Sequence, residues 1–195
     1  MSILNSLIKS SVELCLYDFV HPSKIPNCAS KTNSTNLVLD RNSPEIDLIY
    51  KVQEKRIIDP RFDRGEKCYA ALVDERITSY IWSSRGSVGV DEINMAIKPS
   101  TDEVYLYDAF TIKKWRGNNL YPSILQLALE NAEKENIKRT MIFVGSNNTA
   151  SRKGVIKAGF KLFQTLYYKR FLFFTSSKLS EPIENHSSAQ FIGLK

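Results

Sequence analysis

The sequence VYLYDAFTIKKWRGNNLYPSILQLAL, residues 104–129, joins a strand-like run to an amphipathic segment through one short turn. The run at 104–112 is aromatic and β-branched, a composition that favours a strand. Apolar residues then recur at intervals of three and four, which predicts a helix over 122–136. The turn WRGNNLYP, residues 115–122, therefore leads from the end of a strand to the N-terminus of a helix.

This turn has the features of an anion-binding site. A helix N-terminus leaves backbone N–H groups unpaired and carries partial positive charge, and both attract phosphate. Gly117 permits positive φ, and asparagine also tolerates it, so Asn118 or Asn119 can build the same backbone shape. Pro122 is harmless only in the first turn of a helix, which places the helix start beside this turn. A plain strand-to-helix turn is the alternative interpretation of the stretch taken alone.

The same kinds of pattern predict the other elements. The expected strands are 11–20, 67–74, 77–84, 92–98, 104–112, 139–145 and 161–175, the last as one long strand or two with a bulge. The expected helices are 43–56, 122–136 and 149–160, and residues 21–43 are expected to form a loop. The helical crossover makes strands 104–112 and 139–145 parallel neighbours. The predicted fold class is therefore mixed α/β, with mostly antiparallel strands.

Length and composition indicate an ordinary soluble protein. The 195 residues are 43% hydrophobic and 25% charged, and we expect one domain over 1–175 followed by a polar tail, 176–195, that frays. No apolar run approaches the roughly 20 residues that cross a bilayer, so we expect no membrane partner. The N-terminus lacks the basic cluster of a signal peptide, and Lys9 interrupts its apolar stretch. A cytoplasmic location follows as an expectation.

Cysteine, histidine and charge narrow the classes of ligand. Three cysteines without CxxC spacing and two histidines make a disulfide framework or a metal site improbable, although a Cys–His nucleophile pair stays open. The net charge of +6 favours an anionic ligand, without separating nucleic acid from a phosphorylated cofactor. No basic stripe is interleaved with aromatic residues, so nucleic acid ranks as the least favoured partner and we expect none.

Two segments together resemble the GNAT superfamily, the acetyl-CoA-dependent N-acetyltransferases. One is the turn described above, and the other is TMIFVGSNNTASRKGVIKAGFKLF, residues 140–163. The residues that match the family's motifs are Arg116, Asn119 and Tyr121 in its R/Q-x-x-G-x-G/A turn, Asn148 and Ser151 in its N-x-x-S/A segment, and Gly159 and Phe160 at the end of the following helix. The resemblance covers about residues 104–173, extends less clearly back to 67, and is weak over 1–66.

The resemblance implies a GNAT-type acyl-CoA N-acyltransferase fold, in which the parallel strand pair splays around the cofactor. Acetyl-CoA would be the acyl donor, without a metal; main-chain N–H groups of the turn would bind its pyrophosphate, and the end of the strand would pair with its pantetheine arm. The residues so implied in cofactor binding are Phe110, Thr111, Ile112, Arg116, Gly117, Asn118, Asn119, Leu120, Tyr121, Asn148, Ser151 and Arg152. Lys113, Lys114 and Lys153 either favour the anion at longer range or are solvated surface lysines.

Three positions depart from the family's pattern. Asn119 replaces a glycine of the turn, which its backbone can tolerate. Tyr121 replaces the second small residue, and its ring either packs under the helix or narrows the pyrophosphate site. The tyrosine that protonates the leaving thiolate in many members is replaced by Val155. Tyr167 and Tyr168 are aromatic substitutes on the next strand; we take Tyr168 as the candidate acid, with a packing role as the alternative.

Asp108 is the candidate base, because an attacking amine must lose a proton and a carboxylate can accept it directly or through water. Strand alternation puts Asp108 on one face with Leu106 and Phe110, where a lone carboxylate is costly unless it is paired or functional. A hydrogen-bonded structural aspartate is the alternative, and Glu92 and Glu103 are weaker candidates.

The expected function is transfer of an acetyl group from acetyl-CoA to a primary amine by direct attack in a ternary complex. The acceptor would be a small-molecule or peptide amine. The alternative is a catalytically silent module that has this fold and binds CoA or a protein partner. The identity of the acceptor and the oligomeric state, monomer or homodimer, stay open.

Overall fold

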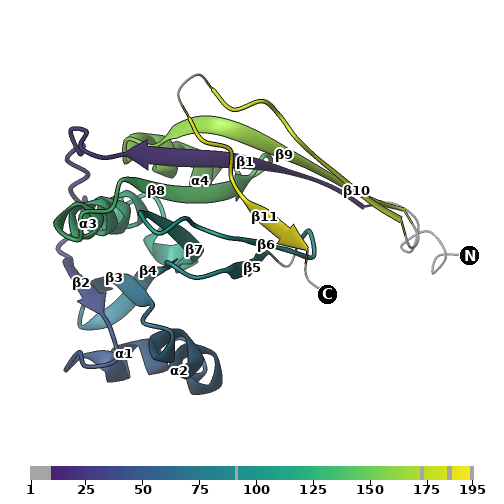
Figure 1. Ribbon diagram of the computed structural model, residues 1–195. Helices are drawn as coiled ribbons and strands as arrows, with labels where there is room; N and C mark the ends of the chain where they lie inside the picture. Colours follow the sequence, from purple (N-terminus) through teal and green to yellow (C-terminus); the bar gives the residue numbers. More distant parts are fainter. Residues whose placement is uncertain (1–9, 91, 172–173, 184–185, 194–195) are drawn as a thin grey trace, which may run out of the picture.

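The computed structural model describes residues 10–90, 92–171, 174–183 and 186–193 (Figure 1). Residues 1–9, which belong to the stretch assessed as a signal sequence, lie outside the described part. The strands are Ser10–Val20 (β1), Thr35–Leu39 (β2), Lys67–Val73 (β3), Arg76–Ser84 (β4), Val88–Val90 (β5), Met95–Ile97 (β6), Glu103–Thr111 (β7), Arg139–Gly145 (β8), Lys161–Phe171 (β9), Phe174–Leu179 (β10) and Phe191–Gly193 (β11). The helices are Ile46–Tyr50 (α1), Lys55–Asp63 (α2), the 3-10 turn Lys113–Trp115 (η1), Leu120–Lys134 (α3) and Thr149–Lys157 (α4).

Eight strands form the central sheet in the order β10-β9-β1-β8-β7-β4-β3-β2, and all pairs but one are antiparallel. The parallel pair is β7 with β8, as predicted, and it runs from Glu103 opposite Arg139 to Leu106 opposite Ile142. Beyond that point β7 continues along β4 only, so the two parallel strands diverge. The predicted mixed α/β fold with one parallel pair in a mostly antiparallel sheet is confirmed.

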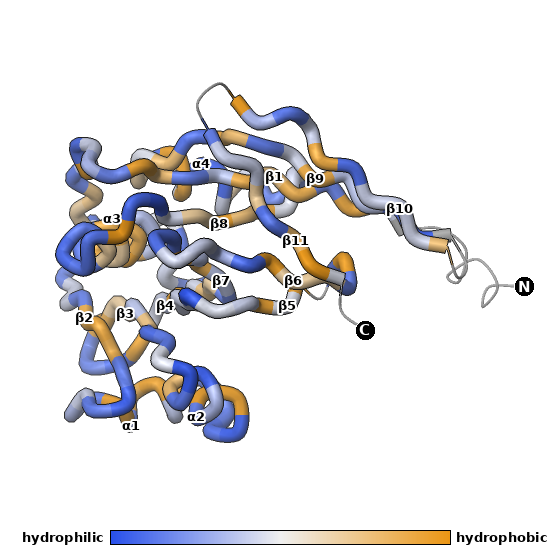
Figure 2. The backbone as a smooth tube through the Cα atoms, in the orientation of Figure 1, coloured by the Kyte–Doolittle hydropathy of each residue, from blue (hydrophilic) through white to orange (hydrophobic). Residues whose placement is uncertain are grey.

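Apolar residues on alternate positions bury both faces of the sheet. Helices α3 and α4 pack on one face, where the helical spacing of Ile124, Leu125 and Ala128 turns these side chains onto Ile81 and Leu106. Helices α1 and α2 lie on the other face at the β2 end, and the small sheet β11-β6-β5 covers that same face farther along (Figure 1). Figure 2 shows hydrophobic residues interspersed with hydrophilic ones along the strands and α2, as expected for elements with one buried side.

The predicted hairpin over β3 and β4 is confirmed, and its turn works without glycine. Asp74 and Glu75 both have positive φ, +51° and +58°, between the paired residues Val73 and Arg76. Two consecutive left-handed residues form the turn whose twist matches that of the flanking strands.

The prediction missed strands β2, β5 and β11 and helix α2. Strand β2 lies inside the predicted loop, and helix α2 follows a shorter first helix than the one expected over 43–56. Pro60 lies within α2, where its missing N–H and its ring disfavour a helix, so the local pattern argued against one. The amphipathic burial of Ile58 and Phe62 nevertheless holds the segment on the sheet.

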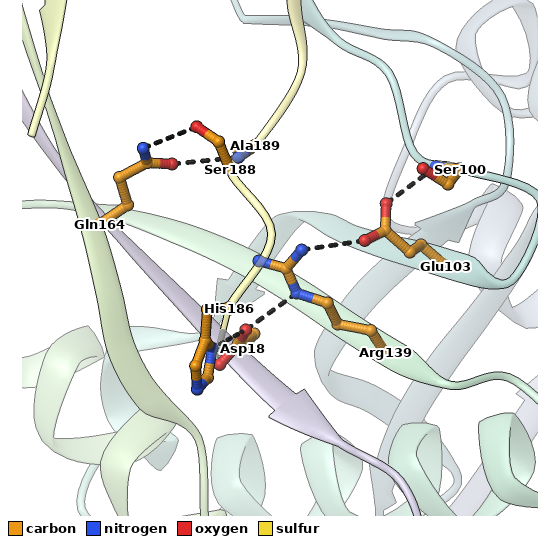
Figure 3. Close-up of polar contacts among 8 residues, drawn as sticks. All are labelled: Asp18, Ser100, Glu103, Arg139, Gln164, His186, Ser188 and Ala189. Carbon is orange, nitrogen blue, oxygen red and sulfur yellow. Dashed lines mark hydrogen bonds and ion pairs between the residues drawn. The ribbon is translucent and has the colours of Figure 1, made fainter. Parts of the chain in front are cut away.

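The prediction that the tail after Ser176 frays is wrong for its described residues. Strand β10 pairs with β9, and β11 pairs with β6. Between them, Gln164 of β9 fixes the chain with three hydrogen bonds. Its Nε2 donates to Ser180 O and Ser188 Oγ, and Ala189 N donates to its Oε1. Figure 3 shows the bonds to Ser188 and Ala189. These contacts join residues far apart in sequence, so a polar local composition gives no sign of them.

A buried charged cluster joins three strands at the closed end of the parallel pair. Arg139 of β8 donates from Nε to Asp18 Oδ2 of β1 at 2.8 Å and from Nη1 to Glu103 Oε1 of β7 at 2.9 Å (Figure 3). His186 Nδ1 lies 2.7 Å from the same Asp18 oxygen, and the guanidinium stacks 4.3 Å from the Phe163 ring. Asp18 is 1% exposed and Arg139 7%, so each charge depends on the other for compensation.

Replacing Arg139 with methionine leaves the Asp18 carboxylate buried without its cationic partner. We expect a loss of about 3–5 kcal/mol in the free energy of unfolding, measured by urea denaturation. Arg41→Met is the matched control, because Arg41 makes exposed ion pairs with Asp59 and Asp63. It should cost no more than about 1 kcal/mol. Equal losses in the two variants would contradict a structural role for the buried cluster.

Candidate functional site

A cleft of about 430 Å³ opens where β7 and β8 diverge. The end of β7, the turn before α3 and the first turns of α3 and α4 form its walls. The lining residues are Ala109, Phe110, Thr111, Trp115, Arg116, Gly117, Asn119, Leu120, Tyr121, Pro122, Asn148, Ala150, Ser151, Lys153, Gly154 and Lys157. Nine of the twelve residues predicted to bind the cofactor therefore gather around one cavity.

The turn before α3 has the backbone shape that an anion site requires. Gly117 has a φ of +84°, and Asn119 is left-handed with φ +59° and ψ +15°. The prediction that an asparagine can take a left-handed position here is confirmed for Asn119. The hydrogen bond from Ser123 N to Asn119 O, 3.0 Å, closes the first turn of α3, so the N–H groups of Leu120 and Tyr121 have no acceptor within the helix.

A loop from the N-terminal part of the chain supports this turn from behind. Lys31 N and Ser30 Oγ donate to Asn118 O at 2.9 and 3.3 Å, and Asn119 Nδ2 donates to Ala29 O at 3.3 Å. Cys28 N donates to Gln126 Oε1 at 2.6 Å, which fastens the same loop to α3. No sequence pattern indicated this support, because the loop has no periodicity.

The start of α4 contributes a second polar edge. Asn148 Oδ1 caps the helix by accepting from Ser151 N at 3.1 Å. Its Nδ2 has no hydrogen-bond partner in the described part of the chain, and Asn148 lines the cleft. Lys153 and Lys157, one helical turn apart on α4, line the cleft as well, whereas Lys113 and Lys114 do not.

Three predicted residues lie behind the walls. Ile112 N donates to Thr78 O at 2.9 Å, and Asn118 holds the supporting loop with its carbonyl. Arg152 turns inward, donating from Nε to Tyr17 OH at 2.9 Å and from Nη1 to Ser146 O at 3.1 Å. Its guanidinium thus ties α4 to β1 and is aimed away from the cavity. Arg116 remains on the wall and donates from Nε to Thr111 O at 3.1 Å.

Tyr121 packs between the two helices. A Cβ added at Gly154 of α4 would lie 2.7 Å from Tyr121 Cδ1, so the ring rests directly on the glycine backbone. Its OH lies 3.5 Å from Ser151 Oγ, and burial raises the pKa of Tyr121 to about 12, which keeps the hydroxyl neutral at physiological pH. Of the two interpretations offered for this tyrosine, the structure shows packing against the neighbouring helix.

Asp108 lies in a β-bulge, and the predicted alternation around it is wrong. The pairing of β4 with β7 shifts register between Tyr80 and Trp82, and Asp108 has a φ of +49°. The extra residue reverses the faces that follow. Leu106 packs with α3, whereas Phe110 packs on Tyr80 on the opposite face, with ring centroids 5.8 Å apart.

The Asp108 carboxylate is paired with the α1–α2 region. Its Oδ2 accepts from Arg61 Nη1 at 2.6 Å and from Gln53 Nε2 at 2.9 Å. The side chain remains 33% exposed and directly precedes the residues of β7 that line the cleft. Pairing therefore offsets the cost of placing a charge here. Asp108 is a hydrogen-bonded aspartate, as the alternative interpretation expected, and its role as a base stays a prediction.

The candidate acid is placed elsewhere. Tyr168 is 5% exposed and packs in the apolar cluster of β1, β9 and β6, away from the residues that line the cleft. Val155 belongs to α4 and is fully buried on the face of the helix that packs in the core. In the described residues there is also no group of three or more His, Cys, Asp or Glu side chains that could hold a metal ion, and no helix long and apolar enough to span a membrane.

Comparison with known proteins identifies the fold. No family model and no curated protein sequence matches the chain. A structure from Novosphingobium aromaticivorans described as a GNAT-family acetyltransferase is 12% identical, with a TM-score of 0.52 over 81% of this chain and 63% of that one. A GCN5-related N-acetyltransferase from Sphaerobacter thermophilus is 8% identical, with a TM-score of 0.61 over 87% and 55%. A GNAT-family acetyltransferase from Colwellia psychrerythraea is 14% identical, with a TM-score of 0.53 over 78% and 54%.

The chain thus spans between 54% and 63% of the length of these three proteins. At such low identities the likeness shows the fold, and this fold is the one expected from the two sequence motifs.

The contact between Tyr121 and Gly154 predicts that Gly154→Ala changes the free energy of unfolding in opposite directions with and without the tyrosine ring. Gly154→Ala alone should destabilise the protein by about 1–3 kcal/mol, because the added methyl group overlaps the ring. In the Tyr121→Ala background the ring is absent, and the same substitution should stabilise by up to about 1 kcal/mol through helix propensity. Thermal and urea unfolding of the four proteins in the cycle measures both effects. A loss of equal size in the two backgrounds would contradict the contact.

Proposed function

We propose that this chain, which has the fold of the GNAT acetyltransferases, is an acyl-CoA-dependent N-acyltransferase that transfers an acetyl group to a primary amine. The observation that supports the proposal best is the cleft between the diverging strands β7 and β8, with the left-handed Asn119 turn and the unpaired N–H groups of α3 on its wall.

The donor set of the cleft suits CoA. Its volume of about 430 Å³ lies within the range of about 300–1,000 Å³ typical of small-molecule sites. The N–H groups of Leu120 and Tyr121 at the start of α3 would bind the pyrophosphate, because a helix N-terminus favours anions. Arg116 and Lys153 on the walls would add positive charge. When bound, acetyl-CoA supplies the thioester that is attacked.

The free edge of β7 would orient the pantetheine arm. Tyr107, Phe110 and Thr111 pair with β4 on one side, and β8 leaves the other side after Leu106. An extended ligand can hydrogen-bond such an edge as an added strand does. Asn148 lines the same cavity, and its Nδ2, which has no partner among the described residues, would bind the same arm. Asp108, next along β7, would accept the proton of the attacking amine directly or through water.

The second candidate function is a catalytically silent module that binds CoA or a protein partner. The burial of Val155 and Tyr168 favours it, because neither position offers a hydroxyl in the cleft to protonate the leaving thiolate. Chemistry does not require one: an alkyl thiol has a pKa of about 8.5, so solvent can supply the proton near neutral pH. Turnover of amines separates the two candidates.

Calorimetry with CoA tests the cofactor half of the proposal. We expect saturable binding that Lys153→Glu weakens at least about tenfold, since it reverses a charge on the cleft wall and removes roughly 1–2 kcal/mol or more. Lys178→Glu on β10 is the matched control, because this exposed lysine lies outside the cleft and should leave the affinity unchanged.

Two results would count against the proposal. Absence of heat and of any thermal shift at millimolar CoA would reject CoA binding itself. Tight CoA binding without thiol release from acetyl-CoA, across aminosugars, alkylamines and peptide N-termini, would favour the silent module.

A further inference from the structure

We propose that Arg61 of α2 is a positioning residue, which together with Gln53 holds the Asp108 carboxylate so that its second oxygen receives the ammonium group of the acceptor. This inference rests on the proposed N-acyltransferase function and assigns the acceptor side of the same site. Asp108 is the candidate base, and Arg61 of α2 is the residue that would orient it.

The two oxygens of Asp108 have different surroundings. Oδ2 takes both hydrogen bonds, from Arg61 Nη1 at 2.6 Å and from Gln53 Nε2 at 2.9 Å. Oδ1 has no partner among the described residues, and the side chain is 33% exposed. A carboxylate anchored through one oxygen and open at the other can bind an ammonium group in a fixed direction.

The two anchoring groups are themselves fixed by aromatic side chains. The Arg61 guanidinium lies 4.9 Å from the ring centroid of Trp82 and 5.0 Å from that of Tyr107, and its side chain is only 14% exposed. Trp82 Nε1 donates to Gln53 Oε1 at 2.8 Å, which directs the amide nitrogen of Gln53 to the carboxylate. The planar guanidinium suits this stacked position in a way that an ammonium group does not.

Tyr107 is in turn fixed by a hydrogen bond to the segment between α2 and β3. Its OH donates to Glu66, which also accepts from Arg64 Nε at 2.8 Å. Burial, and then the hydrogen bond to Glu66, raise the pKa of Tyr107 above its usual range, so the hydroxyl stays a donor. The support of Arg61 therefore extends to a second carboxylate, that of the buried Glu66.

The backbone places this carboxylate beside the reacting position. Asp108 has a φ of +49° in the β-bulge, a conformation uncommon for residues with a Cβ and one that accumulates at functional sites. The next three residues, Ala109, Phe110 and Thr111, line the cleft. The bulge thus turns Asp108 to the face of the sheet that α2 covers. The part of β7 that lines the cleft begins at the next residue.

The step balances with the groups named. The ammonium of the acceptor gives a proton to Asp108 Oδ1, directly or through one water, and the freed nitrogen lone pair attacks the thioester carbonyl carbon. A C–N bond forms, the C–S bond breaks, and its electron pair leaves on sulfur. The nitrogen gives a second proton to solvent as it becomes the amide nitrogen, and the sulfur takes one proton from solvent to leave as the thiol. Both anchors of Oδ2 stay in place throughout.

The experiment compares Arg61→Met, Arg61→Lys, Asp108→Asn and, as the matched control on the same helix, Arg56→Met. Arg56 forms an ion pair with Glu54 and is 78% exposed. The readouts are kcat and the KM for the amine, with acetyl-CoA and benzylamine, glucosamine or glycylglycine as probes. Calorimetry gives the CoA affinity of each variant and the binding of the same amines to the CoA-saturated protein.

We expect Asp108→Asn to lower kcat/KM by about 10²-fold or more, the usual contribution of a positioned base. Arg61→Met should lower it by about 10-fold to 10²-fold through misplacement of the carboxylate, with a higher amine KM. Arg61→Lys should show a smaller loss than Arg61→Met, because lysine keeps the positive charge but cannot stack a planar guanidinium on the aromatic rings. Arg56→Met should stay within twofold, and CoA affinity should be unchanged throughout.

Arg61→Met with wild-type kcat and amine KM would overturn the proposal, and so would a loss confined to CoA affinity. Wild-type protein that binds CoA but neither binds nor acetylates any of the three amines would also overturn it. Failure of the wild-type protein to bind CoA, in contrast, rejects the proposed function itself, so the two failures are distinguishable.

Discussion

The site depends on one constraint in the sheet: the parallel ladder of β7 and β8 is closed at one end and open at the other. Four residue pairs hold the closed end, and Arg139 reinforces it by joining the first residues of both strands to Asp18 of β1. After Leu106 and Ile142 the strands diverge. The buried ion pairs thus hold together the start of the ladder, and the divergence that forms the cleft begins at its other end.

This divergence gives the two faces of the sheet different polar surroundings near the cleft. Helices α3 and α4 pack on one face and bring their N-terminal turns to the cleft, where backbone N–H groups and lysines suit an anion. Helix α2 packs on the other face and brings Arg61 to Asp108. Strand β7 connects them, since a single bulge turns Asp108 to one face while the next residues line the cleft.

Local patterns predicted the segment from 104 to 160 well, because each element there has a clear period and a recognisable start or end. Gly159, with a φ of +95°, ends α4 as its sequence indicated. The errors lie where long-range contacts decide. Helix α2 contains Pro60 and is held by burial, and the tail after Ser176 is held by Gln164. The face of Asp108 depends on a register shift with β4, which no pattern within β7 can reveal.

The turn before α3 shows how a departure from a motif can be compensated by packing. Asn119 takes the left-handed position that the motif gives to glycine, and its side chain also holds the supporting loop. Tyr121 would be expected to obstruct a site built for a small residue. Its ring instead rests on Gly154, where the absence of a Cβ leaves room for it, and the N–H groups of Leu120 and Tyr121 have no acceptor among the residues that the structure describes. The motif has a small residue on α3 at this contact. Here the small residue is Gly154 of α4, and the tyrosine of α3 packs against it, which joins the two helices.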